Sequence, residues 1–140
     1  MGGSVVTDIH EKFRDFCKRH GGKVAFWRLE HPSEIYPEGY CRGVDFNSID
    51  PSEVVDLLDG MRRSLKEEGY VGIRISVEGA YRIEGFLIDI TQKKGGGTQE
   101  KIKLSYGTLE GGQAKKIAER IIEEVGRRAN LMRINIIGDY

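Results

Sequence analysis

The chain has 140 residues, of which 39% are hydrophobic and 31% charged, and its 22 basic residues balance its 22 acidic ones. A chain of this size can bury one hydrophobic core, so we predict a single α+β domain spanning residues 1–140. The zero net charge argues against a polycation that binds nucleic acid through its overall charge. No apolar run reaches about eighteen residues, so we expect neither a transmembrane helix nor a membrane partner.

The N-terminal region lacks the basic and apolar stretches of a secretion signal, so we expect a cytoplasmic protein in which residues 1–7 are flexible. Two cysteines, Cys17 and Cys41, are too few for a disulfide framework. We expect reduced thiols in the cytoplasm, although the count also permits one disulfide. The abundance of Lys, Arg and Glu beside few Asn and Gln residues is typical of thermophilic proteins.

Apolar residues at helical spacing predict three helices, over about residues 8–20, 51–68 and 113–128. The second has the clearest boundaries. Asp50 is suited to cap its N-terminus, Pro51 to occupy the first helical position and Glu53 to lie in the first turn. Gly69 marks its end.

Alternating apolar residues predict six strands, over residues 23–29, 40–46, 70–77, 81–91, 100–107 and 131–138. The first is apolar on both faces, which is typical of an interior strand. In the fourth, the alternation changes phase at Glu84-Gly85, which predicts a β-bulge at that point.

The order of these elements contains a β-α-β-β-α-β path. We therefore predict a two-layer sandwich with a ferredoxin-like βαββαβ core, one extra strand and an N-terminal helix. Two helices cover one sheet face in that fold, so we expect the N-terminal helix to cover part of the other face or an edge. A mixed sheet with a different strand order is the alternative.

The cysteines and histidines suggest a metal site only weakly. Cys17 and His20 have the spacing of a ligand pair, and His31 and Cys41 follow, but the combined spacing matches no zinc module. Whether these four residues meet cannot be decided from sequence. We therefore predict no metal and no cofactor.

The sequence contains no clear catalytic signature. No nucleophile motif surrounds either cysteine. Asp50 is explained as a helix cap and Glu84 as part of a bulge. Asp89 interrupts an apolar strand, which suits either an outward-facing position or an acid–base residue. An enzyme of unknown class is our third hypothesis for the function.

Two glycine-rich segments are candidates for phosphate binding. A phosphate loop needs the N-terminal amides of a helix, and the segment QKKGGGTQEKIK (residues 92–103) leads into a strand instead. The segment at residues 107–112 does lead into a helix, but Glu110 would repel a phosphate. We interpret the first as a flexible hairpin tip and the second as a turn capped by Thr108.

Basic residues recur at outward positions of the predicted strands and in the hairpin, and a basic sheet face with exposed aromatic residues can bind single strands. Our leading hypothesis is a non-enzymatic accessory protein that contacts RNA or single-stranded DNA. The predicted contact residues are Arg74, Lys93, Lys94, Lys101, Lys103, Arg127, Arg128, Arg133 and Tyr70, with Tyr81 and Trp27 as further stacking candidates. Alternatively, these cations only protect sheet edges and keep the surface soluble.

The second hypothesis is an oligomerising or adaptor subunit that makes no contact with nucleic acid. Ile35 and Tyr36 lie in a proline-bounded loop and are the predicted interface anchors, because aromatic residues dominate interface hot spots.

Overall fold

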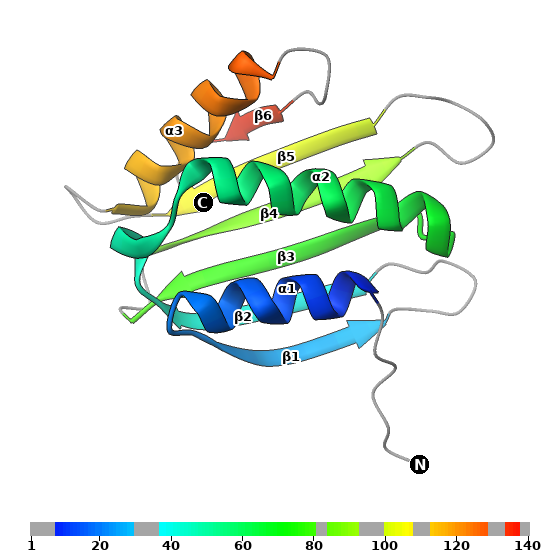
Figure 1. Cartoon of the computed structure of the whole chain (residues 1–140), viewed down its shortest axis with the longest axis horizontal. Coiled ribbons are helices and arrows are strands. Elements are labelled where there is room, and N and C mark those ends of the chain that lie inside the picture. Colours follow the sequence, from blue (N-terminus) through cyan, green and yellow to red (C-terminus); the bar gives the residue numbers. More distant parts are fainter. Residues whose placement is uncertain are drawn as a thin grey trace.

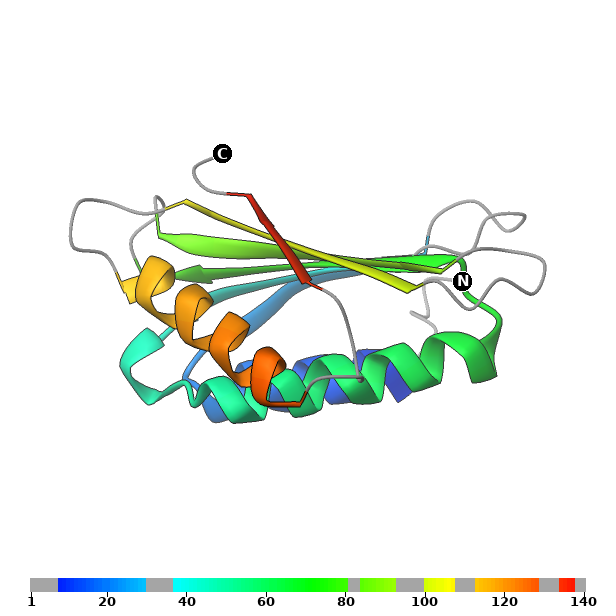
Figure 2. The same cartoon turned by 90° about the horizontal axis from the view of Figure 1, so that it is seen from above.

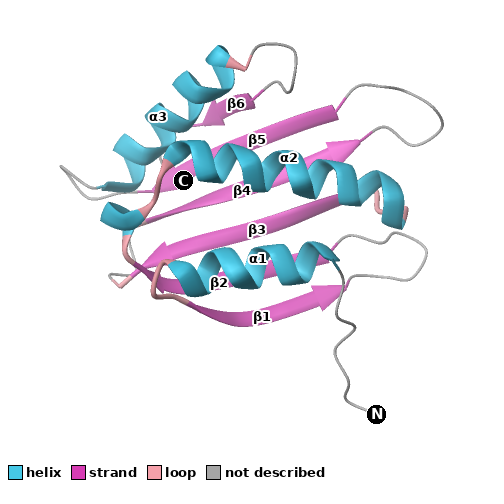
Figure 3. Ribbon diagram, viewed as in Figure 1, coloured by secondary structure: helices cyan, strands magenta, loops and turns pink. Residues whose placement is uncertain are grey.

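A computed structural model describes residues 8–29, 37–80, 84–92, 100–107, 113–128 and 134–137. The helices within these ranges are α1 (Asp8–Arg19), the 3-10 helix η1 (Phe46–Ser48), α2 (Pro51–Glu68) and α3 (Gln113–Arg127). The strands are β1 (Lys23–Leu29), β2 (Pro37–Val44), β3 (Gly72–Gly79), β4 (Gly85–Gln92), β5 (Glu100–Gly107) and β6 (Ile134–Ile137) (Figures 1 and 3).

The strands form one mixed sheet in the order β1-β2-β3-β4-β5-β6. The pairs β2–β3 and β5–β6 are parallel, and the other neighbours are antiparallel. Helix α2 connects the first parallel pair and α3 connects the second. A split βαβ unit would place another strand between the members of each parallel pair, whereas here they are direct neighbours. The α+β class is therefore confirmed, and the ferredoxin-like arrangement is not.

All three helices lie on the same face of the sheet (Figure 2). Our expectation that α1 would cover the other face or an edge is therefore wrong. The reason is that α1 packs beside α2 as well as over β1 and β2, so its apolar side chains join the core that α2 already covers. Phe13 and Phe16 are completely buried in this position. No helix among the described residues is both long and apolar enough to cross a bilayer.

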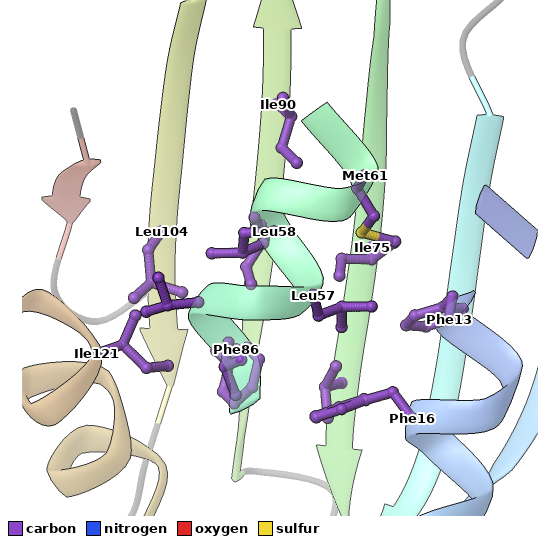
Figure 4. Close-up of a cluster of buried hydrophobic side chains, with 14 of the residues drawn as sticks. Phe13, Phe16, Leu57, Leu58, Met61, Ile75, Phe86, Ile90, Leu104 and Ile121 are labelled. Atoms are coloured by element: carbon purple, nitrogen blue, oxygen red, sulfur yellow. The ribbon is translucent and has the colours of Figure 1, made fainter. Parts of the chain in front are cut away.

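The hydrophobic core fills the space between the helices and the sheet (Figure 4). Each buried aliphatic or aromatic side chain contributes roughly 1.5–3 kcal/mol through removal of apolar surface from water. The core side chains labelled in the close-up are Phe13, Phe16, Leu57, Leu58, Met61, Ile75, Phe86, Ile90, Leu104 and Ile121. The regular apolar spacing in the sequence reflects this single shared core.

Several strand features differ from the prediction. The strand predicted over residues 40–46 is β2 (Pro37–Val44), and Phe46 lies in η1 instead. Among the described strands β1 pairs only with β2, so it is an edge strand. Its register with β2 shifts between Val24 and Phe26, and this is where a bulge occurs. The β3–β4 register is continuous as far as Gly85, so the predicted bulge at Glu84-Gly85 is wrong. Strand β4 begins at Gly85, and Glu84 precedes it.

The start of α2 follows the prediction. The Asp50 carboxylate accepts a hydrogen bond from the Ser52 amide at 3.0 Å, and Pro51 is the first helical residue. This arrangement satisfies an amide that the helix itself leaves without a partner. Glu53, in contrast, turns toward α1, where its carboxylate forms an ion pair with Arg19.

A disulfide joins Cys17 in α1 to Cys41 in β2. Our expectation of two reduced thiols is therefore wrong. Both residues are completely buried, and they lie where the covered face of β2 meets the C-terminal half of α1. The sequence did not show that α1 folds back onto β2, which is what brings the two cysteines together.

Candidate binding face on the open side of the sheet

The sheet face opposite the helices is called the open face below (Figure 2). In β3 the side chains of Ile73 and Ile75 are buried toward the helices, whereas Arg74 between them is exposed on the open face. Strand register then identifies the other residues on this face, because register partners point to the same side. Those with described side chains are Lys23, Phe26, Glu38, Tyr40, Arg42, Arg74, Ser76, Glu78, Leu87, Asp89, Thr91, Lys103 and Ser105.

One row across the open face alternates in charge. Glu38, Arg74, Asp89 and Lys103 are successive register partners in β2, β3, β4 and β5. Arg74 Nε donates to Asp89 Oδ1 at 2.8 Å. Arg74 and Lys103 thus lie on the predicted face, but two carboxylates balance them. The row is not the continuous basic surface that we predicted.

An aromatic pair occupies the β1–β2 end of the open face. The rings of Phe26 and Tyr40 stack with their centroids 5.4 Å apart and their planes inclined by 25°. Phe26 is 43% exposed, and Tyr40 is half-buried. We had not predicted either residue as a contact. Cross-strand register aligns the two rings, and that register is not visible in the sequence of β1 alone.

Two cations lie next to this aromatic pair. Lys23 and Arg42 are register partners in β1 and β2, and both side chains are exposed. Neither forms an ion pair with a described side chain, although Glu78 is the register partner of Arg42 in β3. Like charges directly opposite each other in a sheet are unfavourable. An anion bound between them would relieve this repulsion.

Both described aromatic residues that we proposed for stacking lie elsewhere. Tyr70 is only 6% exposed and belongs to the core, so its predicted outward position is wrong. It precedes β3, and its amide bonds to the Leu65 carbonyl at the end of α2, so strand alternation does not apply to it. Trp27 points toward the helices and stacks on His10 with the centroids 4.7 Å apart.

Arg127 and Arg128 belong to the helix layer and not to the open face. Arg128 Nη1 donates to Asp56 Oδ1 of α2 at 2.5 Å, and this hydrogen bond raises the pKa of Arg128. Arg127 forms an ion pair with Glu124 at 2.5 Å. These two arginines therefore stabilise the end of α3 and its contact with α2, on the opposite side of the molecule from Lys103.

Several predicted contact residues lie outside the described part of the chain: Lys93, Lys94, Arg133, Ile35, Tyr36 and Tyr81. Lys101 belongs to β5 as the register partner of Thr91, but its side chain is not among those described. The predictions for these residues remain predictions. The candidate binding face is thus defined by the described side chains of β1 to β5.

A polar cluster that we had not predicted joins His20, which follows α1, to η1 and α2, and His20 is its buried member. His20 Nδ1 lies 2.8 Å from Ser48 Oγ, and His20 Nε2 lies 3.1 Å from Glu53 Oε2. This connectivity resembles a serine–histidine–acid triad. However, the Ser48 hydroxyl donates to the Asp45 carbonyl at 2.7 Å, so its proton is directed away from His20. The cluster is explained as a structural tie, and its partners are too far apart in sequence to form a motif.

The N-terminus of α3 is already occupied by a carboxylate of the chain. Glu84 Oε1 accepts hydrogen bonds from the amides of Gln113 and Ala114, the second at 2.9 Å. These amides and the helix dipole would otherwise attract an anion. Glu84 is therefore a helix cap, and its negative charge disfavours phosphate at this position.

No group of three described His, Cys, Asp or Glu residues is arranged to hold a metal ion. The sulfurs of Cys17 and Cys41 are bonded to each other, and His20 contacts Ser48 and Glu53, while His31 lies outside the described ranges. Comparisons of the chain with protein-family models, curated proteins and solved structures gave no significant match.

Proposed function

We propose that this chain is a non-enzymatic binding protein for RNA or single-stranded DNA, and that the β1–β2 end of the open face is its contact surface. The observation that carries the proposal is the stacked pair of exposed Phe26 and half-buried Tyr40, which no described helix covers and which lies beside Lys23 and Arg42. The hairpin lysines Lys93 and Lys94 are proposed as additional phosphate contacts.

The chemistry of an unpaired nucleotide fits this surface. A base exposes two apolar faces that stack on aromatic side chains, and such stacking contributes roughly 1–3 kcal/mol per base. Tyr40 and Arg42 lie two residues apart on the same face of β2, which corresponds to about 7 Å. A nucleotide whose base lies on Tyr40 can therefore place its phosphate near Arg42.

The charge pattern favours binding through a small group of residues over binding along a continuous basic surface. The central row of the face, from Phe26 through Tyr40, Ser76 and Leu87 to Ser105, has no formal charge. The neighbouring row from Glu38 to Lys103 is balanced. Binding should thus combine one or two stacked bases with a small number of phosphate contacts, and its dependence on salt should be modest.

The proposal is tested with fluorescently labelled single-stranded oligonucleotides of RNA and DNA, titrated at several salt concentrations. We expect K23E/R42E to weaken binding and to reduce the salt dependence, by about 1.4 in the slope of log K against log salt for two lost phosphate contacts. K115E/K116E makes the same change of charge at two exposed positions of α3 and serves as the matched control.

The control should bind as the wild type does, because Lys115 and Lys116 belong to the helix layer. Equal losses in both double variants would mean that only net charge matters, which would refute the assigned surface. Absence of binding by the wild type at low salt would refute the function itself. K93E/K94E tests the hairpin contribution separately, and an unchanged affinity in that variant would remove the hairpin from the surface.

A further inference from the structure

Helix α1 is attached to the sheet directly beneath the aromatic pair. Trp27 follows Phe26 in β1, and its ring lies parallel to that of His10 in α1 with an interplanar angle of 3°. Cys41 follows Tyr40 in β2 and is bonded to Cys17 in α1. Successive residues of a strand point to opposite faces. Each aromatic residue of the open face is therefore one residue away from an anchor to α1.

The surroundings of the disulfide leave little room for movement. A Cβ atom added at Gly22 would lie 2.9 Å from Cys41 Sγ and 3.0 Å from Cys17 Sγ, and it would also clash with Val44 Cγ1 at 2.8 Å. Gly22 thus allows the backbone after α1 to pass close to both sulfurs. Two unbonded thiols need more space than a disulfide, so reduction increases the crowding between α1 and β2.

We propose that the Cys17–Cys41 disulfide positions the aromatic pair, so that the affinity of the open face for single strands depends on the redox state of this bond. The inference rests on the proposed function. Reduction allows α1 to shift and loosens the support of β2 next to Tyr40. The geometry of the Phe26–Tyr40 pair then becomes less well defined, and a stacked base loses part of its contact.

The reductant is a dithiol. One of its thiolates attacks a cysteine sulfur and breaks the disulfide, which gives a mixed disulfide and one protein thiolate that takes up a proton. The second thiol of the reductant then releases the other cysteine, and the reductant becomes a cyclic disulfide. Two electrons and two protons pass to the protein. Because both sulfurs are completely buried, the C-terminal turn of α1 must open before the attack.

The experiment compares oxidised wild-type protein with protein treated with dithiothreitol until two free thiols are titrated. Two properties are measured, namely the affinity for a single-stranded oligonucleotide and the fluorescence of Trp27, which is the only tryptophan of the chain. We expect reduction to lower the affinity by about two- to fivefold, less than the full loss of a stacked base. The emission of Trp27 should change because its contact with His10 is altered.

The variant C17S/C41S is the control for the reagent. It should bind with the affinity of the reduced wild type and should not respond to dithiothreitol. If this variant does not fold, H10A tests the other anchor while the disulfide stays intact, and it should also weaken binding. Circular dichroism of each sample establishes that the helices and strands are retained.

The inference and the proposed function fail in different ways. If the oxidised wild type does not bind any single strand, the proposed function is refuted. In that case a change of Trp27 emission and faster amide exchange in β1 and β2 after reduction would still support the coupling between the disulfide and the aromatic pair. If the protein binds but reduction leaves the affinity, the emission and the exchange unchanged, the inference is refuted and the function stands.

Discussion

Arg74 and Asp89 are neighbours on adjacent strands of the open face, and their side chains form an ion pair with 2.8 Å between Arg74 Nε and Asp89 Oδ1. The pair neutralises the arginine at the centre of the face. Lys23 and Arg42 at the β1–β2 end lack such partners among the described side chains. Lys23 and Arg42 are therefore two adjacent cations without a described ion pair, and they lie near Phe26 and Tyr40.

This distribution predicts different salt dependences for two arginine variants. R42A should reduce the slope of log K against log salt for a single-stranded oligonucleotide by about 0.7, because one phosphate contact is lost. R74A should leave the slope nearly unchanged, since Asp89 already engages its guanidinium. Equal effects of R42A and R74A would contradict a localised contact.

The Glu84 cap predicts a specific loss of stability. E84A should lower the free energy of unfolding by about 1–2 kcal/mol, because two amides at the start of α3 lose their acceptor. E84Q should lose less, since its amide oxygen can still accept. Urea denaturation measures these differences, and E119A at an exposed position of the same helix is the control. A loss in E119A as large as in E84A would contradict the capping role.

The disulfide between Cys17 and Cys41 should stabilise the fold by restricting the unfolded chain. The two residues are 24 positions apart, and closing a loop of this length corresponds to about 3–4 kcal/mol. We expect urea unfolding of the wild type to shift to lower denaturant concentration when dithiothreitol is present. C17A/C41A should unfold at the same concentration with and without it. An identical midpoint for oxidised and reduced wild type would contradict this contribution.

A contact between α1 and α2 has a predictable dependence on pH. Ser64 donates to Asp8 at 2.6 Å and holds the pKa of Asp8 below its usual value of 3.8. Burial raises the pKa of Glu68 above its usual value of 4.5, although its carboxylate accepts from the Asp8 amide. The stabilisation that ionised Asp8 adds to the free energy of unfolding is thus present above pH 3.8, and it is lost as the pH falls through the lowered pKa of Asp8. The stabilisation that protonated Glu68 adds to the free energy of unfolding is present below pH 4.5, and it is lost as the pH rises through the raised pKa of Glu68.

The variant E68Q separates these two effects. It keeps an oxygen that can accept from the Asp8 amide but removes the buried charge, so it should be more stable than the wild type at pH 7. The difference should shrink as the pH is lowered through the raised pKa of Glu68 toward 4.5, because folded wild-type protein takes up a proton on Glu68 over this range. Thermal unfolding across this pH range measures the change. A constant difference at all pH values would show that the ionisation of Glu68 has no effect on stability.

The secondary structure could be predicted because it depends on local patterns. The spacing of apolar residues located the three helices, and the sequence Asp50-Pro51-Ser52-Glu53 marked the start of α2. Strand order depends instead on which elements pack together. The side on which α1 lies is decided by its contact with α2, and nothing in the local pattern of either helix reports that contact.

The candidate site was predicted only in part for the same reason. Arg74 and Lys103 do lie on the open face, because alternation within a strand correctly gave their direction. Their neutralisation depends on the β3–β4 register, which puts Asp89 beside Arg74. The Phe26–Tyr40 pair depends on the β1–β2 register across a bulge. Such register relationships cannot be obtained from one strand at a time.

The central claim is that bases stack on the exposed aromatic pair, and a comparison of two alanine variants tests it most directly. Phe26 and Ile122 are the large hydrophobic residues that the described part of the chain exposes, at 43% and 37%, on the open face and on α3 respectively. F26A should weaken binding of a single-stranded oligonucleotide by at least about fivefold, the lower limit for one lost stack, whereas I122A should bind as the wild type does. Equal affinities of F26A, I122A and the wild type would contradict the claim.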